Sequence, residues 1–207
     1  MTADVVALTR RSLHGIAELV LAGPQHREIG RIRLRIVGEG FGTLSEPSLR
    51  VEGGVLVTGT ARIPLSGQTY ASLAEAAGIE AGAPERLYPD GSGVKPDEVI
   101  TFDPEAGAVI LRAFVAGDEA LRGFAPGTEP VLWPEHFDLA ITLDEVNYGV
   151  SPGDGHLPEP YAYVGPHRPR EGEFWNAPFG AALTLRDLGS ADAIQRFFEE
   201  GKRRTDT

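Results

Sequence analysis

Side chains that can do chemistry gather between residues 133 and 179. This stretch holds three of the chain's five histidines and both of its tryptophans, and prolines and glycines interrupt it throughout. Aromatic side chains with polar groups, set among rigid turns, are typical of small-molecule pockets. We therefore expect a ligand site here, with eight candidate residues: Trp133, His136, Asp138, Tyr148, His156, Glu159, Tyr161 and Trp175.

Four of these residues form a candidate metal site. His136 and Asp138 are two residues apart on a predicted strand, so their side chains should share one face. His156 and Glu159 follow in the next loop, and imidazoles with carboxylates suit zinc, iron or manganese. The alternative is that His136 is a buried imidazole bonded to Asp138 or to backbone. The spacing matches no metal motif, so no cofactor and no catalytic residue is assigned.

The aromatic residues of the stretch also have an alternative interpretation. Tyr161 and Tyr163 share one face of a predicted strand, which is equally typical of core packing. The sequence Gly149 to Gly153 matches the G-x-S-x-G pattern of serine hydrolases, but the residue after the serine is Pro152. Proline has no N–H to donate to an oxyanion hole, so we interpret this segment as a turn.

Composition limits the class of protein. The chain has 207 residues, 42% of them hydrophobic, which suits one compact domain over residues 1–207. Its 30 acidic residues against 19 basic ones disfavour binding to nucleic acid or to anionic lipid. There is no cysteine, no apparent signal peptide and no apolar run of membrane-spanning length, so a soluble cytoplasmic protein is expected. The oligomeric state is not indicated.

The hydrophobic pattern predicts an α+β fold dominated by antiparallel, hairpin-linked strands with a few flanking helices. Helices are expected over residues 4–22, 66–77 and 190–202, the first ending at Gly23-Pro24 and the last capped by Ser190. Strands are expected over residues 29–37, 137–143 and 161–164, and hairpins over 49–57 and 99–116. Residues 81–97 are the best candidate for a mobile loop. Arg31, Arg33 and Arg35 should form a basic stripe that pairs with the chain's own carboxylates.

Three strings of the sequence resemble a bacterial family that is common in actinobacteria. They are WPEHFDLAITLDEVNYGVSPGD from Trp133, EPYAYVGP from Glu159 and FWNAPFG from Phe174. The family shares a W-P-x-H-F-D-L-A motif and a downstream Y-x-Y-x-x-P segment. It has no established activity, so the resemblance implies a soluble bacterial protein and supplies no catalytic residues.

The leading hypothesis is a small-molecule-binding protein or enzyme with its site in residues 133–179. One alternative is a metal-dependent enzyme that uses His136, Asp138, His156 and Glu159. Another is a protein–protein interaction module whose aromatic loops bind a partner or a second copy.

Overall fold

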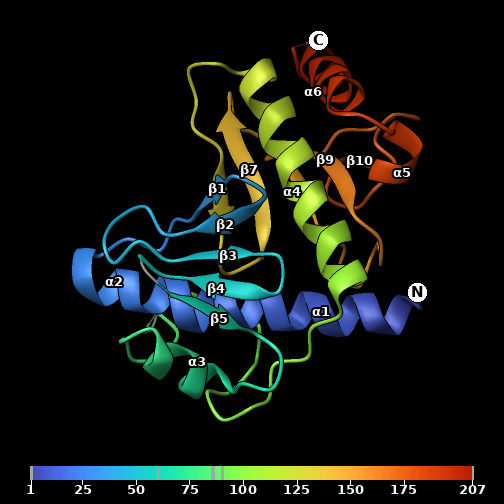
Figure 1. The fold of residues 1–207 in the computed structure, drawn as a ribbon. Coiled ribbons are helices and arrows are strands. Elements are labelled where there is room, and N and C mark those ends of the chain that lie inside the picture. Colours follow the sequence, from blue (N-terminus) through green and yellow to red (C-terminus); the bar gives the residue numbers. More distant parts are fainter. Residues whose placement is uncertain (1, 60, 85–86, 90, 207) are drawn as a thin grey trace. The chain divides into compact units, whose positions relative to one another are not determined.

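The computed structural model describes residues 2–59, 61–84, 87–89 and 91–206 (Figure 1). It has the predicted α+β class, with two five-stranded sheets and flanking helices. The helices are α1 (Ala3–Gly15), η1 (Ile16–Ala22), α2 (Gly23–Ile29), α3 (Tyr70–Ala76), α4 (Pro104–Phe124), α5 (Leu185–Leu188) and α6 (Ala191–Thr205). The strands are β1 (Arg35–Val37), β2 (Gly40–Gly42), β3 (Arg50–Glu52), β4 (Val55–Val57), β5 (Arg62–Pro64), β6 (Val131–Trp133), β7 (Asp138–Leu143), β8 (Val146–Ser151), β9 (Tyr161–Pro166) and β10 (Ala181–Thr184).

The chain divides into two compact units. The first contains Met1–Leu111 and Leu132–Phe137, and the second contains Arg112–Val131 and Asp138–Thr207. The sheet order is β1-β2-β3-β4-β5 in one sheet and β10-β9-β8-β7-β6 in the other. The single domain that the sequence predicts stays a prediction. Within the described residues, no helix combines the length and the apolar composition needed to cross a membrane.

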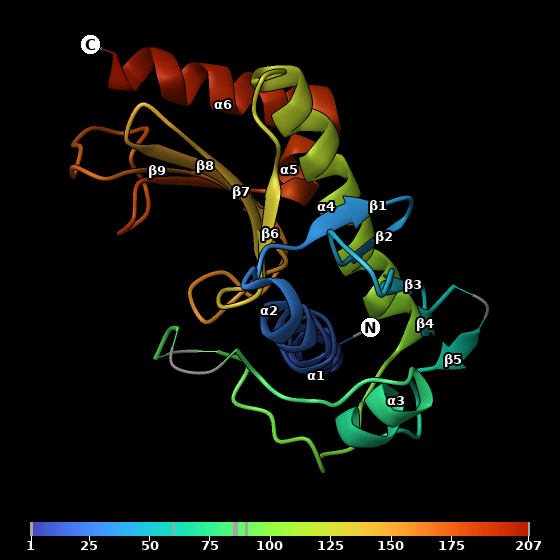
Figure 2. The same ribbon diagram turned by 90° about the vertical axis from the view of Figure 1, so that its left-hand side faces the viewer.

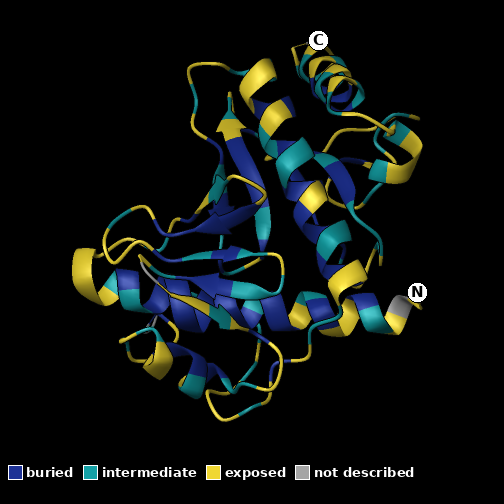
Figure 3. Ribbon diagram, viewed as in Figure 1, coloured by how far each residue is buried: buried dark blue, intermediate teal, exposed yellow. Residues whose placement is uncertain are grey.

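The first helix does not end at Gly23-Pro24, contrary to the prediction. The π-helix η1 follows α1 directly, and Pro24 lies at the start of α2, which ends where Gly30 adopts a φ of 69°. In a normal α-helix the Pro24 ring would clash with the carbonyl one turn earlier. The wider π turn moves that carbonyl away, so the rod continues (Figure 1). Every residue of η1 is buried (Figure 3).

The first sheet confirms one predicted hairpin. β3 and β4 pair antiparallel, with Val51 opposite Leu56, and Gly53 makes the turn at a φ of 56°. The strand predicted over residues 29–37 is shorter than expected, because Ile29 ends α2 and regular pairing begins at Arg35. The segment 81–97 has no helix or strand among its described residues, and residues 85, 86 and 90 of it lie outside the described part.

The hairpin predicted over residues 99–116 is wrong, because α4 occupies most of this range. Its sequence, PEAGAVILRAFVAGDEALRGF, looked strand-like in its apolar middle. Asp103 caps the helix, since its Oδ1 accepts a hydrogen bond of 2.9 Å from the Ala106 N–H. Pro104 is favourable at the first helical position, where its missing N–H costs nothing. The cap and the alanine-rich helix therefore outweigh the β-branched run.

The second unit is built on β7 to β10, and α4 and α6 pack on this sheet (Figure 2). Gly117 of α4 allows close approach, since a Cβ there would lie 2.8 Å from Val150 Cγ2. Phe124, Tyr148 and Phe198 join both helices to the sheet through ring contacts.

Two predictions for this unit can be compared with the structure. The Ser190 cap of α6 is confirmed. The turn predicted from Gly149 is wrong, because β8 continues to Ser151 and pairs with β9.

We expect Asp103→Ala to lower the free energy of unfolding by about 1 kcal/mol, because it removes the cap of α4. Urea denaturation measures this. Asp97→Ala, which removes an exposed carboxylate outside any helix, is the control and should leave the midpoint unchanged. Equal midpoints for the two variants would show that the cap contributes nothing.

Candidate functional site

The eight predicted site residues are divided between the two units. Trp133 and His136 belong to the first unit, and the other six belong to the second. A site shared by all eight residues therefore stays a prediction. The structure shows the neighbours of each of these residues within its own unit.

The shared strand face predicted for His136 and Asp138 is wrong. β7 begins only at Asp138, and Phe137 before it has a φ of 54°, which belongs to the left-handed region. The Phe137 N–H donates to the Trp133 carbonyl at 2.8 Å, so His136 lies in a turn, where its side chain is exposed. The positive φ breaks the alternation on which the prediction depended.

Two tyrosine–aspartate pairs organise the predicted region of the second unit. The Tyr161 hydroxyl donates to Asp154 at 2.6 Å, and the Tyr163 hydroxyl donates to Asp138. Burial would raise the pKa of Asp154, but hydrogen bonds from Tyr161 and from two backbone N–H groups outweigh it and hold that pKa below its ordinary value. Burial, and next the bond to Asp154, raises the pKa of Tyr161. The hydrogen bonds to Asp154 from Tyr161 and from the N–H groups of His156 and Leu157 fix the loop after β8.

The other predicted residues of this unit also have structural partners. Tyr148 is buried between Phe124 and Phe198. Glu159 forms an ion pair of 3.1 Å with Arg186. The remaining two make ring contacts: Trp175 with Phe174 at 4.9 Å, and His156 with Phe179 at 5.5 Å.

No group of three or more histidines and carboxylates forms a metal-binding arrangement in the described part of the chain. The metal site predicted from His136, Asp138, His156 and Glu159 thus has no geometric support, and it stays a prediction.

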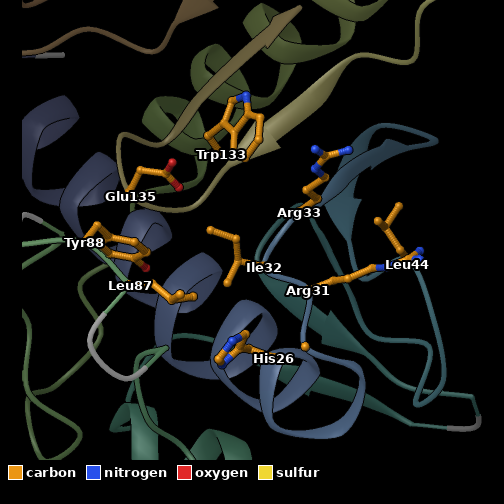
Figure 4. A pocket seen from close by; sticks show the side chains of 10 residues that line it. His26, Arg31, Ile32, Arg33, Leu44, Leu87, Tyr88, Trp133 and Glu135 are labelled. Atoms are coloured by element: carbon orange, nitrogen blue, oxygen red, sulfur yellow. The ribbon is translucent and has the colours of Figure 1, made fainter.

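The first unit contains a pocket of about 670 Å³, which Figure 4 shows from close by. This volume lies within the usual range for small-molecule sites. Trp133 is the predicted candidate that lines it. The complete lining is His26, Gly30, Arg31, Ile32, Arg33, Leu44, Leu87, Tyr88, Trp133 and Glu135.

The pocket opens where two chain segments separate. Leu34 and Leu132 form an isolated antiparallel bridge, with N–H to carbonyl distances of 3.1 and 3.0 Å. The next hydrogen-bonded pair of such a ladder would join Ile32 to Pro134. Pro134 has no N–H to give, so pairing stops and the segments diverge. Residues on either side of the gap then line the pocket.

Gln25 fixes the wall that carries the arginines. This side chain is only 3% exposed, and its amide nitrogen donates to the carbonyls of Arg31 and Arg33, at 3.0 and 2.8 Å. Its amide oxygen accepts from the Leu44 N–H at 2.6 Å. The Gln25 amide thus forms hydrogen bonds with three backbone groups that are not paired in a regular β-sheet. These hydrogen bonds hold the backbone of both arginines in place.

His14 fixes the opposite wall. Its Nε2–H donates to the Pro134 carbonyl at 2.7 Å, and its ring stacks on Phe137 with centroids 5.4 Å apart. Burial lowers the pKa of His14 below its ordinary value of 6.5, partly opposed by the bond to Pro134. Trp133 and Glu135 flank Pro134 in the sequence. The neutral His14, which lies one helix turn before Glu18, therefore positions the segment that carries these two lining residues.

Glu18 supports a third part of the pocket from within η1. Glu18 is 5% exposed, and its carboxylate accepts hydrogen bonds from the Ser92 N–H at 2.9 Å and the Ser92 hydroxyl at 2.6 Å. Burial, and next the nearby Glu18, raises the pKa of Tyr88 above its ordinary value of 10.0. The Tyr88 hydroxyl is protonated at neutral pH and faces the Glu18 carboxylate.

One polar atom of the lining is buried and unsatisfied, because Glu135 Oε2 has no hydrogen-bond partner among the described residues. Tyr88 Oη is also buried without a well-formed hydrogen bond, but it faces the Glu18 carboxylate. Leaving such an atom unpaired costs about 1–3 kcal/mol, so each one requires an explanation. A carboxylate that can accept and a phenol that can donate are the two groups a polar ligand would need here.

The ion pairs predicted for Arg31, Arg33 and Arg35 are not formed with any carboxylate among the described residues. Arg33 instead lies over the Trp133 ring, 5.4 Å from its centroid. The prediction was wrong because the acidic residues near in sequence bind other arginines; Glu52, for example, pairs with Arg62 at 2.8 Å.

Sequence reasoning found Trp133 but missed its pocket partners. Glu135 lies in the same W-P-E-H string, so the proximity of a carboxylate to an indole was a usable signal. Tyr88 gives no such signal, because residues 81–97 have the composition of a loop.

Comparison of this chain with protein-family models, with curated proteins and with solved structures finds no match. The resemblance to an actinobacterial family stays a prediction, and the function has to be argued from the geometry of the site.

The buried neutral His14 should make the first unit sensitive to acid. Below about pH 6.5 the unfolded chain binds a proton that the folded chain does not, so stability rises with pH in this range. We expect a slope of up to about 1.4 kcal/mol per pH unit. The free energy of unfolding is measured at several pH values by urea denaturation of the Trp175→Phe variant, in which Trp133 emission reports on unfolding.

The variant His14→Gln keeps an N–H donor without titrating, so it should flatten this slope. His167→Gln, at an exposed histidine of the second unit, should retain it. An unchanged slope in His14→Gln would contradict the assignment.

Proposed function

We propose that this chain is a small-molecule-binding protein whose ligand occupies the pocket beside Trp133. The observation that carries the proposal is a buried carboxylate oxygen, Glu135 Oε2, that has no hydrogen-bond partner among the described residues and lies in the lining of the cavity. A ligand that donates to this carboxylate would satisfy it, and the Tyr88 hydroxyl could donate to the same ligand.

The apolar part of the lining supports the same function. Leu44 and Leu87 are 39% and 50% exposed, so apolar surface lies open to solvent beside the pocket. Covering such surface contributes about 25 cal/mol per Å². Trp133 provides a flat aromatic wall, and Figure 4 shows Ile32 in the middle of the lining. An apolar ligand body with polar ends matches this distribution.

Rigid support also favours binding. His14 holds the Trp133 to Glu135 segment and Gln25 holds the arginine wall, before any ligand arrives. A preformed site loses less conformational entropy when a ligand binds, and so it binds more tightly.

The test uses opposite effects on stability and on affinity. Glu135→Gln removes a buried charge that has no partner, and Tyr88→Phe removes a hydroxyl that has no well-formed hydrogen bond, so the free protein should be as stable as wild type or more stable. Affinity for a ligand should fall about tenfold in each variant, as one hydrogen bond is lost. A structural role for these residues predicts lower stability instead.

The ligand is sought by screening metabolites against the Trp175→Phe protein, in which Trp133 is the single indole. A ligand at about a hundred times its Kd should stabilise the protein by about 2.7 kcal/mol. Glu173→Gln, at an exposed acid of the second unit, is the control. Ligands that bind equally well to wild type, Glu135→Gln and Tyr88→Phe would place binding elsewhere and refute the proposal.

A further inference from the structure

The pocket carries opposite charges on two separately anchored walls. Figure 4 shows Glu135 and Tyr88 on one side, Arg31 and Arg33 on the other, and Ile32 between them. Neither arginine forms an ion pair with Glu135 or with another carboxylate of the described residues. Acid and base thus share one cavity without neutralising each other.

The backbone explains why these charges stay apart. Gln25 binds the carbonyls of Arg31 and Arg33, whereas His14 binds the carbonyl of Pro134. Arg33 is also held over the Trp133 ring by a cation–π contact. Closing the gap would break these contacts, so the separation of the two charges is built into the fold.

We infer that the ligand is a zwitterion with an ammonium group at one end, a carboxylate at the other and an apolar body between them. The ammonium would bind Glu135, and the carboxylate would bind Arg33. Guanidinium groups recognise carboxylates in a two-bond geometry, which makes this end the more directional one. This inference rests on the proposed function, because it names the class of ligand for the same pocket.

The residues between the two charged walls of the pocket indicate that the middle of the ligand is apolar. Ile32, Leu87 and the Trp133 ring line the pocket between the charged groups, and none of them offers a charge. A ligand with a polar middle would lose water there without gaining hydrogen bonds. A straight or aromatic hydrocarbon spacer therefore fits best, and its length sets the affinity.

The experiment measures the affinity of ω-amino carboxylic acids of increasing chain length by Trp133 emission in the Trp175→Phe protein. The alkylamine and the alkanoate of each length are the single-charge controls. One chain length should bind at least about tenfold more tightly than either of its controls. Glu135→Gln should weaken the amino acid and the amine but not the alkanoate. Arg33→Gln should weaken the amino acid and the alkanoate but not the amine.

Arg35→Gln is the matched control, because Arg35 has the same charge two residues away and is not part of the lining. It should leave all affinities unchanged. If single-charge compounds bind the pocket as tightly as the zwitterions, the inference is overturned while the proposed function stands. If no compound of this series or of the metabolite screen loses affinity in Glu135→Gln, the inference and the proposed function are both overturned.

Discussion

Two hydrogen bonds between Leu34 and Leu132 determine where the pocket of the first unit lies. They join segments almost a hundred residues apart in the chain, and Pro134 prevents the next pair from forming. In a longer ladder, the side chains of both segments would pack against each other and leave no cavity. The single bridge keeps the segments together at one point, and the proline makes them diverge from it.

Divergent segments would be costly without other partners for their backbone groups. Gln25 and His14 provide these partners, and both come from the continuous rod of α1, η1 and α2. The π-helical turn lets this rod pass Pro24 without ending, so it carries Gln25 as well as His14 and Glu18. A π turn in a helix is often found at a functional site, and here it keeps His14, Glu18 and Gln25 on one continuous rod beside the pocket.

Local sequence rules predicted the elements whose stability is local. The β3–β4 hairpin follows from Gly53, and α6 follows from the Ser190 cap and its apolar spacing. The rules failed at two local features and wherever a distant contact decides. The local features are the π turn that lets the rod pass Pro24, and the Asp103 cap of α4, which outweighed a β-branched run. Trp133 was found by its type, whereas Tyr88 matters through residues far away in the sequence, and Gln25 matters through backbone groups of Arg31, Arg33 and Leu44.

The dense aromatic stretch from Trp133 to Phe179 therefore contains two kinds of chemistry. In the second unit, Tyr161 and Tyr163 each donate to an aspartate, so their polar groups are satisfied and contribute to packing. In the first unit, Glu135 Oε2 has no hydrogen-bond partner among the described residues, and the Tyr88 hydroxyl makes no well-formed hydrogen bond there. Residue type alone cannot separate these cases, because a tyrosine is the same residue in both. What separates them is whether the fold supplies the second half of the hydrogen bond, and an atom that the fold leaves unsatisfied is where a ligand gains the most.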